Sequence, residues 1–213
     1  MDLELKQQEL RARRLGDEED EDEPKQKGKK DKEPKSKLEE KILETRTILL
    51  FGEISQKSAR EVCEKLILLS SLNDNDIKLI INSQGGHVEA GDTIHDMIKF
   101  VKPKVKILGT GWVASAGAHI YLGAKRENRL SLPFTRFLLH QPLGGVQGQA
   151  SDIQIEAEEI IKMRERLNRE IAAETGQPFD KVVRDTERNY WLSAEEAKDY
   201  GLVGRIIQTA DQV

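Results

Sequence analysis

Ser115 and His140 are the residues of this chain whose types and neighbours could perform catalysis. Ser115 lies in residues 113–117 (VASAG), where small neighbours let its hydroxyl lie exposed at a helix start, beside backbone N–H groups. A serine hydroxyl is a poor nucleophile until an imidazole within hydrogen-bonding reach removes its proton, and His140 follows on a later element. The pair predicts a serine nucleophile with a histidine base. The alternative is a small-residue segment that serves only the close packing of a helix on a strand.

Four segments around these two residues together carry a family resemblance. They are residues 80–91 (IINSQGGHVEAG), 109–118 (GTGWVASAGA), 140–150 (HQPLGGVQGQA) and 185–189 (DTERN). In this order and spacing they resemble the ClpP family, the proteolytic subunits of the ATP-dependent Clp protease (peptidase family S14), over residues 47–207. The resemblance implies a serine endopeptidase that cleaves unfolded polypeptides to short peptides inside a ring-shaped chamber.

The resemblance also assigns roles to individual residues. Ser115 matches the family nucleophile, His140 the general base, and the N–H groups of Gly86 and Ala116 the oxyanion hole. The third position of the triad falls on Asn189, where the family usually has Asp. An amide can orient the imidazole but carries no charge to stabilise the imidazolium, so we expect weakened self-activation.

Further residues near these positions have their own expectations. Asp185 matches the first Asp of the family's Asp-Thr-x-Arg-Asp pattern and not the catalytic one. Glu187 and Arg188 match a pair that in this family contacts the opposite ring, and the alternative is an exposed ion pair that contributes little. Gln84 stands where the family usually has Pro, which predicts a looser loop before the two glycines.

Strand-like and helix-like runs alternate from residue 42 onward. The strand-like runs are 47–51, 77–81 and 105–108, and the helix-like runs are 59–69, 88–100 and a helix that opens near residue 114. Such alternation predicts βαβ units and a largely parallel sheet, with Ser115 at a strand-to-helix junction. The resemblance implies the α/β ClpP/crotonase-like fold of repeated ββα units with a protruding handle helix.

Residues 144–150 are rich in Gly and Gln and lead into a long helical pattern with an apolar stripe. The stripe consists of Ile153, Ala157, Ile160, Ile161, Leu167 and Ile171. The plain interpretation is a flexible loop before an ordinary core helix. The resemblance implies instead the handle, which interlocks two rings, while the preceding strand lies along the substrate and binds it by main-chain pairing with broad specificity.

Nucleotide, metal and cofactor sites have little support. The Gly85–Gly86 pair precedes a helix, but no Gly-x-Gly-x-x-Gly or Gly-Lys-Ser/Thr sequence accompanies it, so an N–H donor to an oxyanion is the better interpretation. No metal-binding spacing links His87, His95 and His119, and we expect structural or surface roles for them, with His87 the most favoured for substrate contact. No metal or cofactor is expected.

Composition limits the remaining function classes. The net charge of −4 and the pI near 5.7 give no reason to expect nucleic-acid binding. No apolar stretch approaches the roughly 18 to 20 residues that cross a bilayer, and a secretory signal is not found, so we expect no membrane association and a cytoplasmic location. Cys63, the single cysteine, lies among apolar neighbours and is expected to be a small buried hydrophobe.

The chain divides by composition near residue 41. Residues 1–41 hold 12 Lys and Arg and 14 Asp and Glu, which predicts a disordered charged extension before a peptidase domain at residues 42–213; an interaction tail is the alternative. The resemblance implies an AAA+ unfoldase (Clp ATPase) partner. The apolar axial segment that normally meets it has no match in this chain.

The resemblance further implies stacked heptameric rings, formed by this chain alone or mixed with a second ClpP subunit. Two other functions stay open. One is a catalytically weak structural paralogue in mixed rings, which Asn189 motivates. The other is a crotonase-like acyl-CoA enzyme, which would share the fold and use paired backbone N–H groups, but with carboxylates where this chain has Ser and His.

Overall fold

The computed structural model describes residues 33–213, with side chains from Lys37 onward. Lys37–Val213 form one compact unit. Helix α2 (Glu33–Glu44) begins inside the segment that the sequence predicted to be disordered and continues past residue 41. The domain boundary at residue 41 stays a prediction. Residues 1–32, which make up the rest of that predicted extension, lie outside the described residues.

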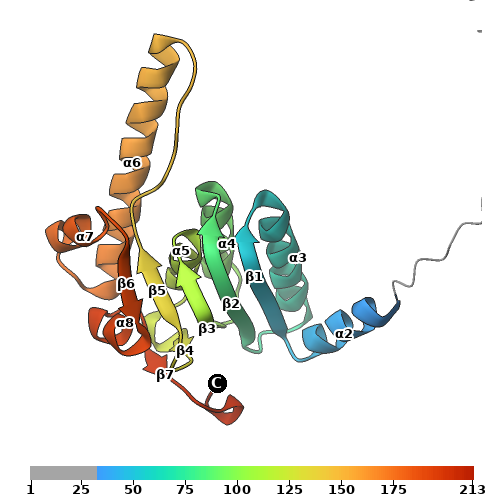
Figure 1. Cartoon of the computed structure of the whole chain (residues 1–213). Coiled ribbons are helices and arrows are strands. Elements are labelled where there is room, and N and C mark those ends of the chain that lie inside the picture. Colours follow the sequence, from blue (N-terminus) through green and yellow to red (C-terminus); the bar gives the residue numbers. More distant parts are fainter. Residues whose placement is uncertain (1–32) are drawn as a thin grey trace, which may run out of the picture. The chain divides into compact units, whose positions relative to one another are not determined.

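A twisted, mostly parallel sheet forms the centre of the unit (Figure 1). Its main path runs in the order β1 (Thr47–Ile54), β2 (Ile77–Gly86), β3 (Val105–Ala114), β4 (Arg129–Ser131) and β7 (Arg205–Ile206). Strand β5 (Arg136–Leu139) pairs in parallel with the end of β3, and β6 (Tyr190–Ser193) runs antiparallel to β5. The predicted largely parallel sheet is therefore confirmed.

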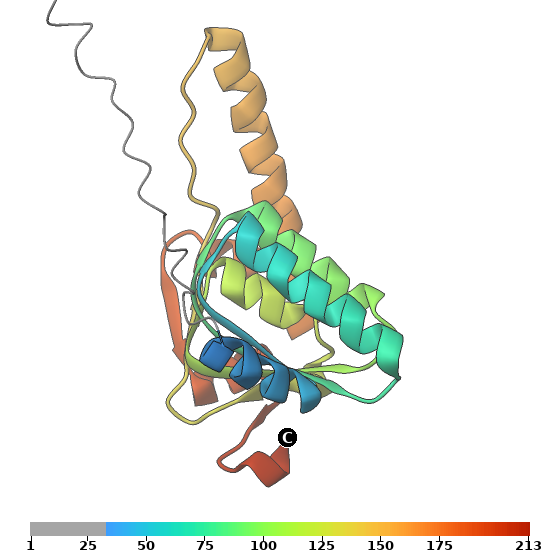
Figure 2. The same cartoon turned by 90° about the vertical axis from the view of Figure 1, so that its right-hand side faces the viewer.

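Helices α3 (Gln56–Leu72), α4 (Val88–Phe100) and α5 (Ala116–Leu122) cover one face of this sheet (Figure 2). Helix α3 begins where Ser55 caps it: Ser58 N donates to Ser55 Oγ at 3.2 Å, and Ser55 N donates to Ser58 Oγ at 2.9 Å. The apolar faces of these helices pack against alternate residues of the strands. Fully buried examples are Leu66, Ile77, Leu79, Ile94 and Ile107, each contributing about 1.5–3 kcal/mol by burial.

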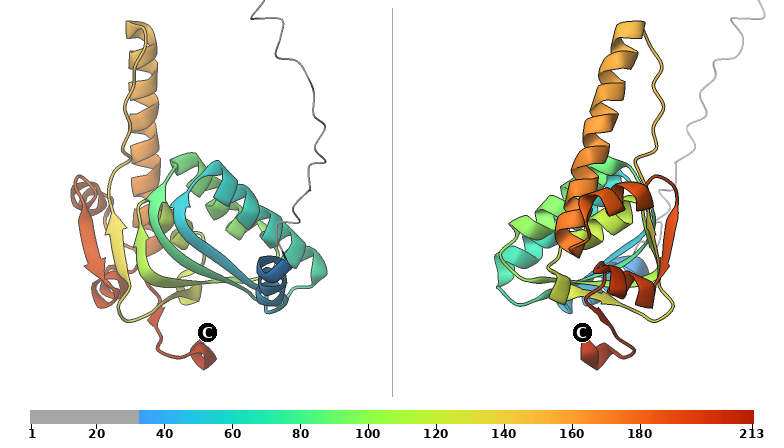
Figure 3. Two further views of the ribbon diagram at one scale, coloured as in Figure 1. Left: turned by 45° about the vertical axis from the view of Figure 1, so that its right-hand side comes forward. Right: turned by 90° about the vertical axis from the view of Figure 1, so that its left-hand side faces the viewer.

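The long helix α6 (Ala150–Thr175) projects beyond the sheet, and the segment before it runs alongside (Figure 3). The lower part of its predicted stripe is covered, since Ile171 is buried. The upper part is exposed, with Ile153 at 41% and Ile161 at 64% of full accessibility. The stripe therefore belongs to a projecting helix and not to an ordinary core helix. The remaining elements are η1 (Arg126–Asn128), α7 (Phe179–Asp185), α8 (Ala194–Tyr200) and η2 (Ala210–Gln212).

The structure also bears on the burial of Cys63 and on the length and polarity of the helices. Cys63 is half-buried and not fully buried, because it lies at the margin of the apolar face of α3; burial still raises the pKa of its thiol. Within residues 33–213, every helix is too short or too polar to cross a bilayer.

Candidate active site

Ser115 lies in a strained turn between a strand and a helix. Strand β3 ends at Ala114, α5 begins at Ala116, and Ser115 between them has φ 55° and ψ −122°. A positive φ is unfavourable for any residue with a Cβ and is kept only where surroundings enforce it. Here Ser115 N donates to Leu138 O at 2.9 Å, and Ser115 O accepts from His119 N at 3.1 Å. This is the backbone geometry of a nucleophile elbow, which presents the hydroxyl at the carboxyl edge of the sheet.

The two glycines at the end of β2 are closely packed, and the first of them lies against this turn. A Cβ on Gly85, which has φ +97°, would lie 2.6 Å from Ser115 Cβ. A Cβ on Gly86, with φ +150°, would lie 2.2 Å from Ile54 O. Neither position has room for a side chain, so the backbone of Gly85 lies directly beside Ser115, and the backbone of Gly86 lies against Ile54 of β1. The residue before them, Gln84, is exposed but still within β2, and a looser loop there stays a prediction.

Ala116 supplies a second backbone group next to Ser115. As the first residue of α5, it has an amide N–H without an acceptor in its own helix. Helix N-termini also carry partial positive charge, which favours a developing anion. The oxyanion hole formed by the N–H groups of Gly86 and Ala116 stays a prediction.

His140 follows directly after β5 and shares a small cavity with Ser115. Both residues line a space of about 40 Å³ whose walls also include Leu139 and Pro142. The Nε2 atom of His140 is buried and has no hydrogen-bond partner among the described residues. The Ser115 hydroxyl and the His140 imidazole therefore line the same cavity but do not form a hydrogen bond with each other. Catalytic hydrogen bonds are often long or absent before substrate binds.

Asn189 lies beside His140 because of the pairing of β5 with β6. The register places Leu139 opposite Tyr190, so the residues just beyond this pair are neighbours. Burial lowers the pKa of His140, and a side-chain hydrogen bond with Asn189 opposes that shift. The imidazole is thus neutral at pH 7, the form a general base requires, and its neighbour is an amide without charge.

Several contacts fix the segment that carries Asn189. Gln141 N donates to Thr186 O at 2.7 Å, and Gln141 Nε2 donates to Glu187 O at 2.9 Å. The fully buried Thr186 has its Oγ1 2.9 Å from Asn168 Oδ1 on α6. The base of the projecting helix is consequently hydrogen-bonded to the turn three residues before Asn189.

Asp185 and Glu187, two other charged residues of this segment, have partners within the chain. Asp185 Oδ2 lies 2.6 Å from Lys181 Nζ and accepts from Tyr200 Oη at 2.9 Å, so its carboxylate is occupied away from His140. Glu187 forms an ion pair with Arg164 of α6. The contact of Glu187 and Arg188 with an opposite ring stays a prediction.

The sequence did not anticipate the cluster behind the serine. His119 on α5 and His95 on α4 stack with ring centroids 4.4 Å apart, and His119 Nε2 lies 2.8 Å from Asp92 Oδ1. His119 also lines the cavity at Ser115. By contrast His87, the histidine most favoured for substrate contact, is about half exposed, with Nδ1 3.1 Å from Glu89 Oε2.

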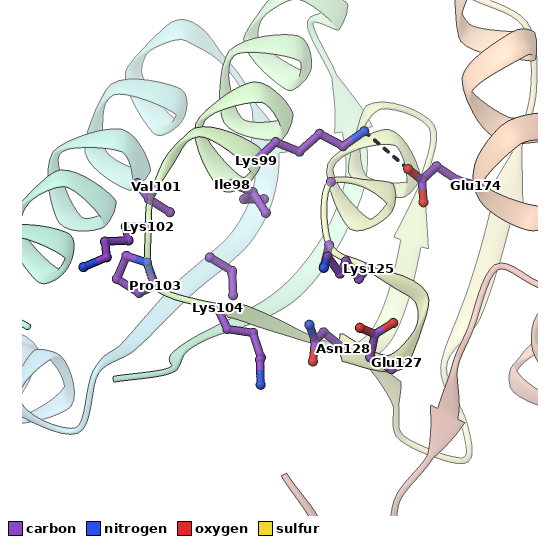
Figure 4. Close-up of a pocket in the computed structure, with 13 residues that line it drawn as sticks. Ile98, Lys99, Val101, Lys102, Pro103, Lys104, Lys125, Glu127, Asn128 and Glu174 are labelled. Atoms are coloured by element: carbon purple, nitrogen blue, oxygen red, sulfur yellow. Dashed lines mark hydrogen bonds and ion pairs between the residues drawn. The ribbon is translucent and has the colours of Figure 1, made fainter. Parts of the chain in front are cut away.

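A larger cavity of the described unit lies elsewhere (Figure 4). It has a volume of about 530 Å³ and contains neither Ser115 nor His140. Its charged lining is mainly four lysines: Lys99, Lys102, Lys104 and Lys125. Two of them already have carboxylate partners: Lys99 lies 3.4 Å from Glu174, and Lys102 pairs with Asp74. We therefore place the chemistry at the smaller cavity, which holds a nucleophile and a base.

Comparisons with known proteins identify the family to which this chain is similar. The sequence matches the Clp protease family over residues 30–210. It is 62% identical over 169 residues to the ATP-dependent Clp protease proteolytic subunit 3 of Rhizobium johnstonii, covering 79% of this chain and 87% of the relative. It is 51% identical over 178 residues to subunit 2 of Pseudomonas aeruginosa, covering 84% of this chain and 89% of the relative.

Solved structures give the same result. ClpP1 from Listeria monocytogenes superimposes with a TM-score of 0.75 at 57% identity, covering 82% of this chain and 98% of that one. An Asn-to-Asp mutant of the same protein gives a TM-score of 0.77 at the same identity and coverage. The ClpP-like α/β fold is thereby confirmed, and the crotonase-like alternative loses its support. From its fold, its sequence and its relatives, this chain belongs to the Clp protease family and is a serine-type peptidase subunit.

Proposed function

We propose that this chain is a proteolytic subunit in which Ser115 is the nucleophile, His140 the general base and Asn189 the residue that orients the base. The observation that carries this assignment is the positive φ of Ser115 at the junction of β3 and α5, beside a cavity that His140 also lines. Strain of this kind persists where it serves a site. A serine used only for packing would have no reason to adopt it.

The chemistry proceeds by acyl transfer. His140 Nε2 takes the proton of Ser115 Oγ as this oxygen attacks the peptide carbonyl, and the imidazolium then gives the proton to the leaving amine. The N–H groups of Gly86 and Ala116 stabilise the oxyanion of the tetrahedral intermediate, where one donor is worth about 3–4 kcal/mol. Water, activated by the neutral His140, then hydrolyses the acyl-enzyme.

The proposed biological setting is a ring assembly fed by an unfoldase. The relatives are named as proteolytic subunits of an ATP-dependent protease. The described residues form the peptidase, and the proposed source of ATP hydrolysis is a Clp ATPase partner. The exposed stripe on α6 supports burial against a second copy in stacked heptameric rings, which would enclose the sites. Unfolded polypeptides are the proposed substrates and the cytoplasm the proposed location. Residues 42–213 form the proposed peptidase domain, and residues 1–41 a charged extension.

A second candidate is a catalytically weak subunit that works in mixed rings with an active ClpP. It is favoured by the buried Nε2 of His140, which lacks a hydrogen-bond partner in the described part, and by the uncharged Asn189 beside the ring. In this case a neighbouring subunit would align the triad.

Labelling with an alkyl fluorophosphonate separates the two candidates. The purified protein is treated alone and after mixing with a second ClpP subunit, and intact mass with peptide mapping identifies the modified serine. Modification of Ser115 in the lone protein supports an autonomous peptidase, and modification only in the mixture supports the weak subunit. Absence of modification in both, or modification that persists in Ser115→Ala, would overturn the assignment.

A further inference from the structure

The cavity beside Ser115 has apolar walls and one additional polar residue. The walls are Val88, Ala116, Leu139, Pro142, Leu167 and Ile171. Apart from the proposed nucleophile and base, the polar member of the lining is His119. A recess directly beside a serine nucleophile accepts the side chain of the residue whose carbonyl is attacked. The chemistry of His119 therefore bears on which residue the enzyme prefers there.

The imidazole of His119 is held rigidly and is poorly satisfied. Its side chain is 9% exposed, and it stacks on His95 with an angle of 13° between the rings. Both ring nitrogens are buried, and neither makes a well-directed hydrogen bond within residues 37–213, although Nε2 lies close to Asp92. A buried polar group without a partner is costly unless a ligand supplies one.

Asp92 fixes the character of this imidazole. Arg166 on α6 donates to both of its carboxylate oxygens, at 3.0 and 2.7 Å. Although burial by itself raises the pKa of Asp92, His119 and Arg166 outweigh it and lower the pKa to about 2. The carboxylate is thus ionised and favours a proton on Nε2 of His119, which leaves Nδ1 as the acceptor.

The surroundings of His119 carry charges of both signs. Helix α4 contributes Asp92 and His95, and α6 contributes Arg166 and Glu170, whose Oε1 lies 3.2 Å from His95 Nε2. Asp96 of α4 also lies 3.0 Å from His95 Nδ1, and Lys99 of α4 pairs with Glu170. Because the charged groups around the two rings already pair with one another or with the rings, a further full charge in the cavity would lack a partner. A neutral side chain that donates a hydrogen bond suits the site better.

We propose that His119, oriented by Asp92, selects a neutral hydrogen-bonding side chain at the acyl side of the scissile bond, with the carboxamide of Asn preferred over the similarly shaped but apolar Leu. The amide N–H would donate to Nδ1 of His119, which an apolar side chain leaves unpaired. This inference rests on the proposed function of Ser115. His119 is a specificity-determining residue, and Asp92 acts through it as a positioning residue.

The test compares two peptidyl phosphonates that differ only in an Asn-like or a Leu-like side chain at this position. Their rates of Ser115 modification are followed by intact mass for the wild type, His119→Phe and Asp92→Asn. In the wild type the Asn-like reagent should react about 10–100-fold faster, since sites built for a hydrogen bond discriminate strongly against analogues that lack it. In His119→Phe the preference should disappear or reverse, and in Asp92→Asn it should fall by several-fold.

Two controls keep the outcomes distinct. Asp74→Asn removes the same charge from an exposed site outside the cavity, so its preference should equal that of the wild type. Circular dichroism and size exclusion verify folding, and the nearly isosteric Asp92→Asn carries the test if His119→Phe misfolds. Equal or faster reaction of the Leu-like reagent with the wild type, or an unchanged preference in a folded variant, overturns the inference alone. If an alkyl fluorophosphonate also leaves Ser115 unmodified, alone and in mixed rings, the proposed function fails with it.

Discussion

Replacing Asn189 by Asp adds a carboxylate beside an imidazole that now has only an amide. The pairing of Leu139 with Tyr190 holds this position next to His140. Opposite unit charges about 4 Å apart at an effective dielectric constant of about 20 attract by about 4 kcal/mol, which limits the gain to about 10³-fold. Because Asn189 already orients the ring, we expect kcat to rise by about 10–10³-fold.

The same substitution should change the pH dependence. In the wild type, burial holds the pKa of His140 below its usual value. A carboxylate favours the imidazolium, so the pKa of His140 rises in Asn189→Asp. Since the base acts only when deprotonated, activity of the variant should fall at a higher pH than activity of the wild type as the pH is lowered.

The assay is turnover of a small fluorogenic peptide as a function of pH, with assembly followed by size exclusion. Asn73→Asp is the control, because it adds the same charge at the exposed end of α3. If assembly and not chemistry is deficient, the variant stays inactive alone, and a second subunit restores cleavage. An intact ring of Asn189→Asp with unchanged or lower activity would refute the reasoning, and the third catalytic group would have to be sought elsewhere.

Three further perturbations test the surrounding structure. Gly85→Ala should lower kcat/KM at least about 10²-fold and destabilise the fold by about 1–3 kcal/mol, because the new Cβ would lie 2.6 Å from Ser115 Cβ. A variant with the activity and the Tm of the wild type would contradict this prediction. Thr186→Val should lower the free energy of unfolding by about 1–3 kcal/mol in denaturant titrations, since the contact with Asn168 is lost, whereas Thr186→Ser should be close to wild type. Limited proteolysis should remove residues before the compact unit Lys37–Val213 first, and protection of that segment in the free protein would oppose the predicted extension.

Sequence periodicity predicted the elements whose pattern is local. Helix α4 has the predicted bounds because its apolar positions recur at helical spacing and the Gly pair ends the strand before it. Strand β3 is longer than predicted, because its second half contains Gly109 and Gly111 and is stabilised by pairing with β5, where Trp112 lies opposite Arg136. Pairings of this kind join distant residues and leave no local signal.

Some features of the site could likewise be predicted from the sequence, and others could not. Ser115 and His140 stood out because their residue types carry chemistry, and the family resemblance pointed to Asn189. The positive φ of Ser115 and the stack of His95 on His119 were not predictable, because both follow from how α4, α5 and the sheet pack. A histidine at an ordinary helical position gives no sign in the sequence that it borders a cavity.

The central claim is that Ser115, activated by His140, performs the cleavage, and turnover of a fluorogenic peptide by substituted particles tests it most directly. The assay compares the wild type with Ser115→Ala, His140→Ala and a control, Ser151→Ala, which replaces an exposed serine on α6. Each protein is measured alone and after mixing with a partner subunit whose own nucleophile has been replaced. Ser115→Ala and His140→Ala should each lose at least about 10³-fold in kcat with assembly intact, while Ser151→Ala keeps wild-type turnover. Undiminished cleavage by an assembled Ser115→Ala particle would contradict the account.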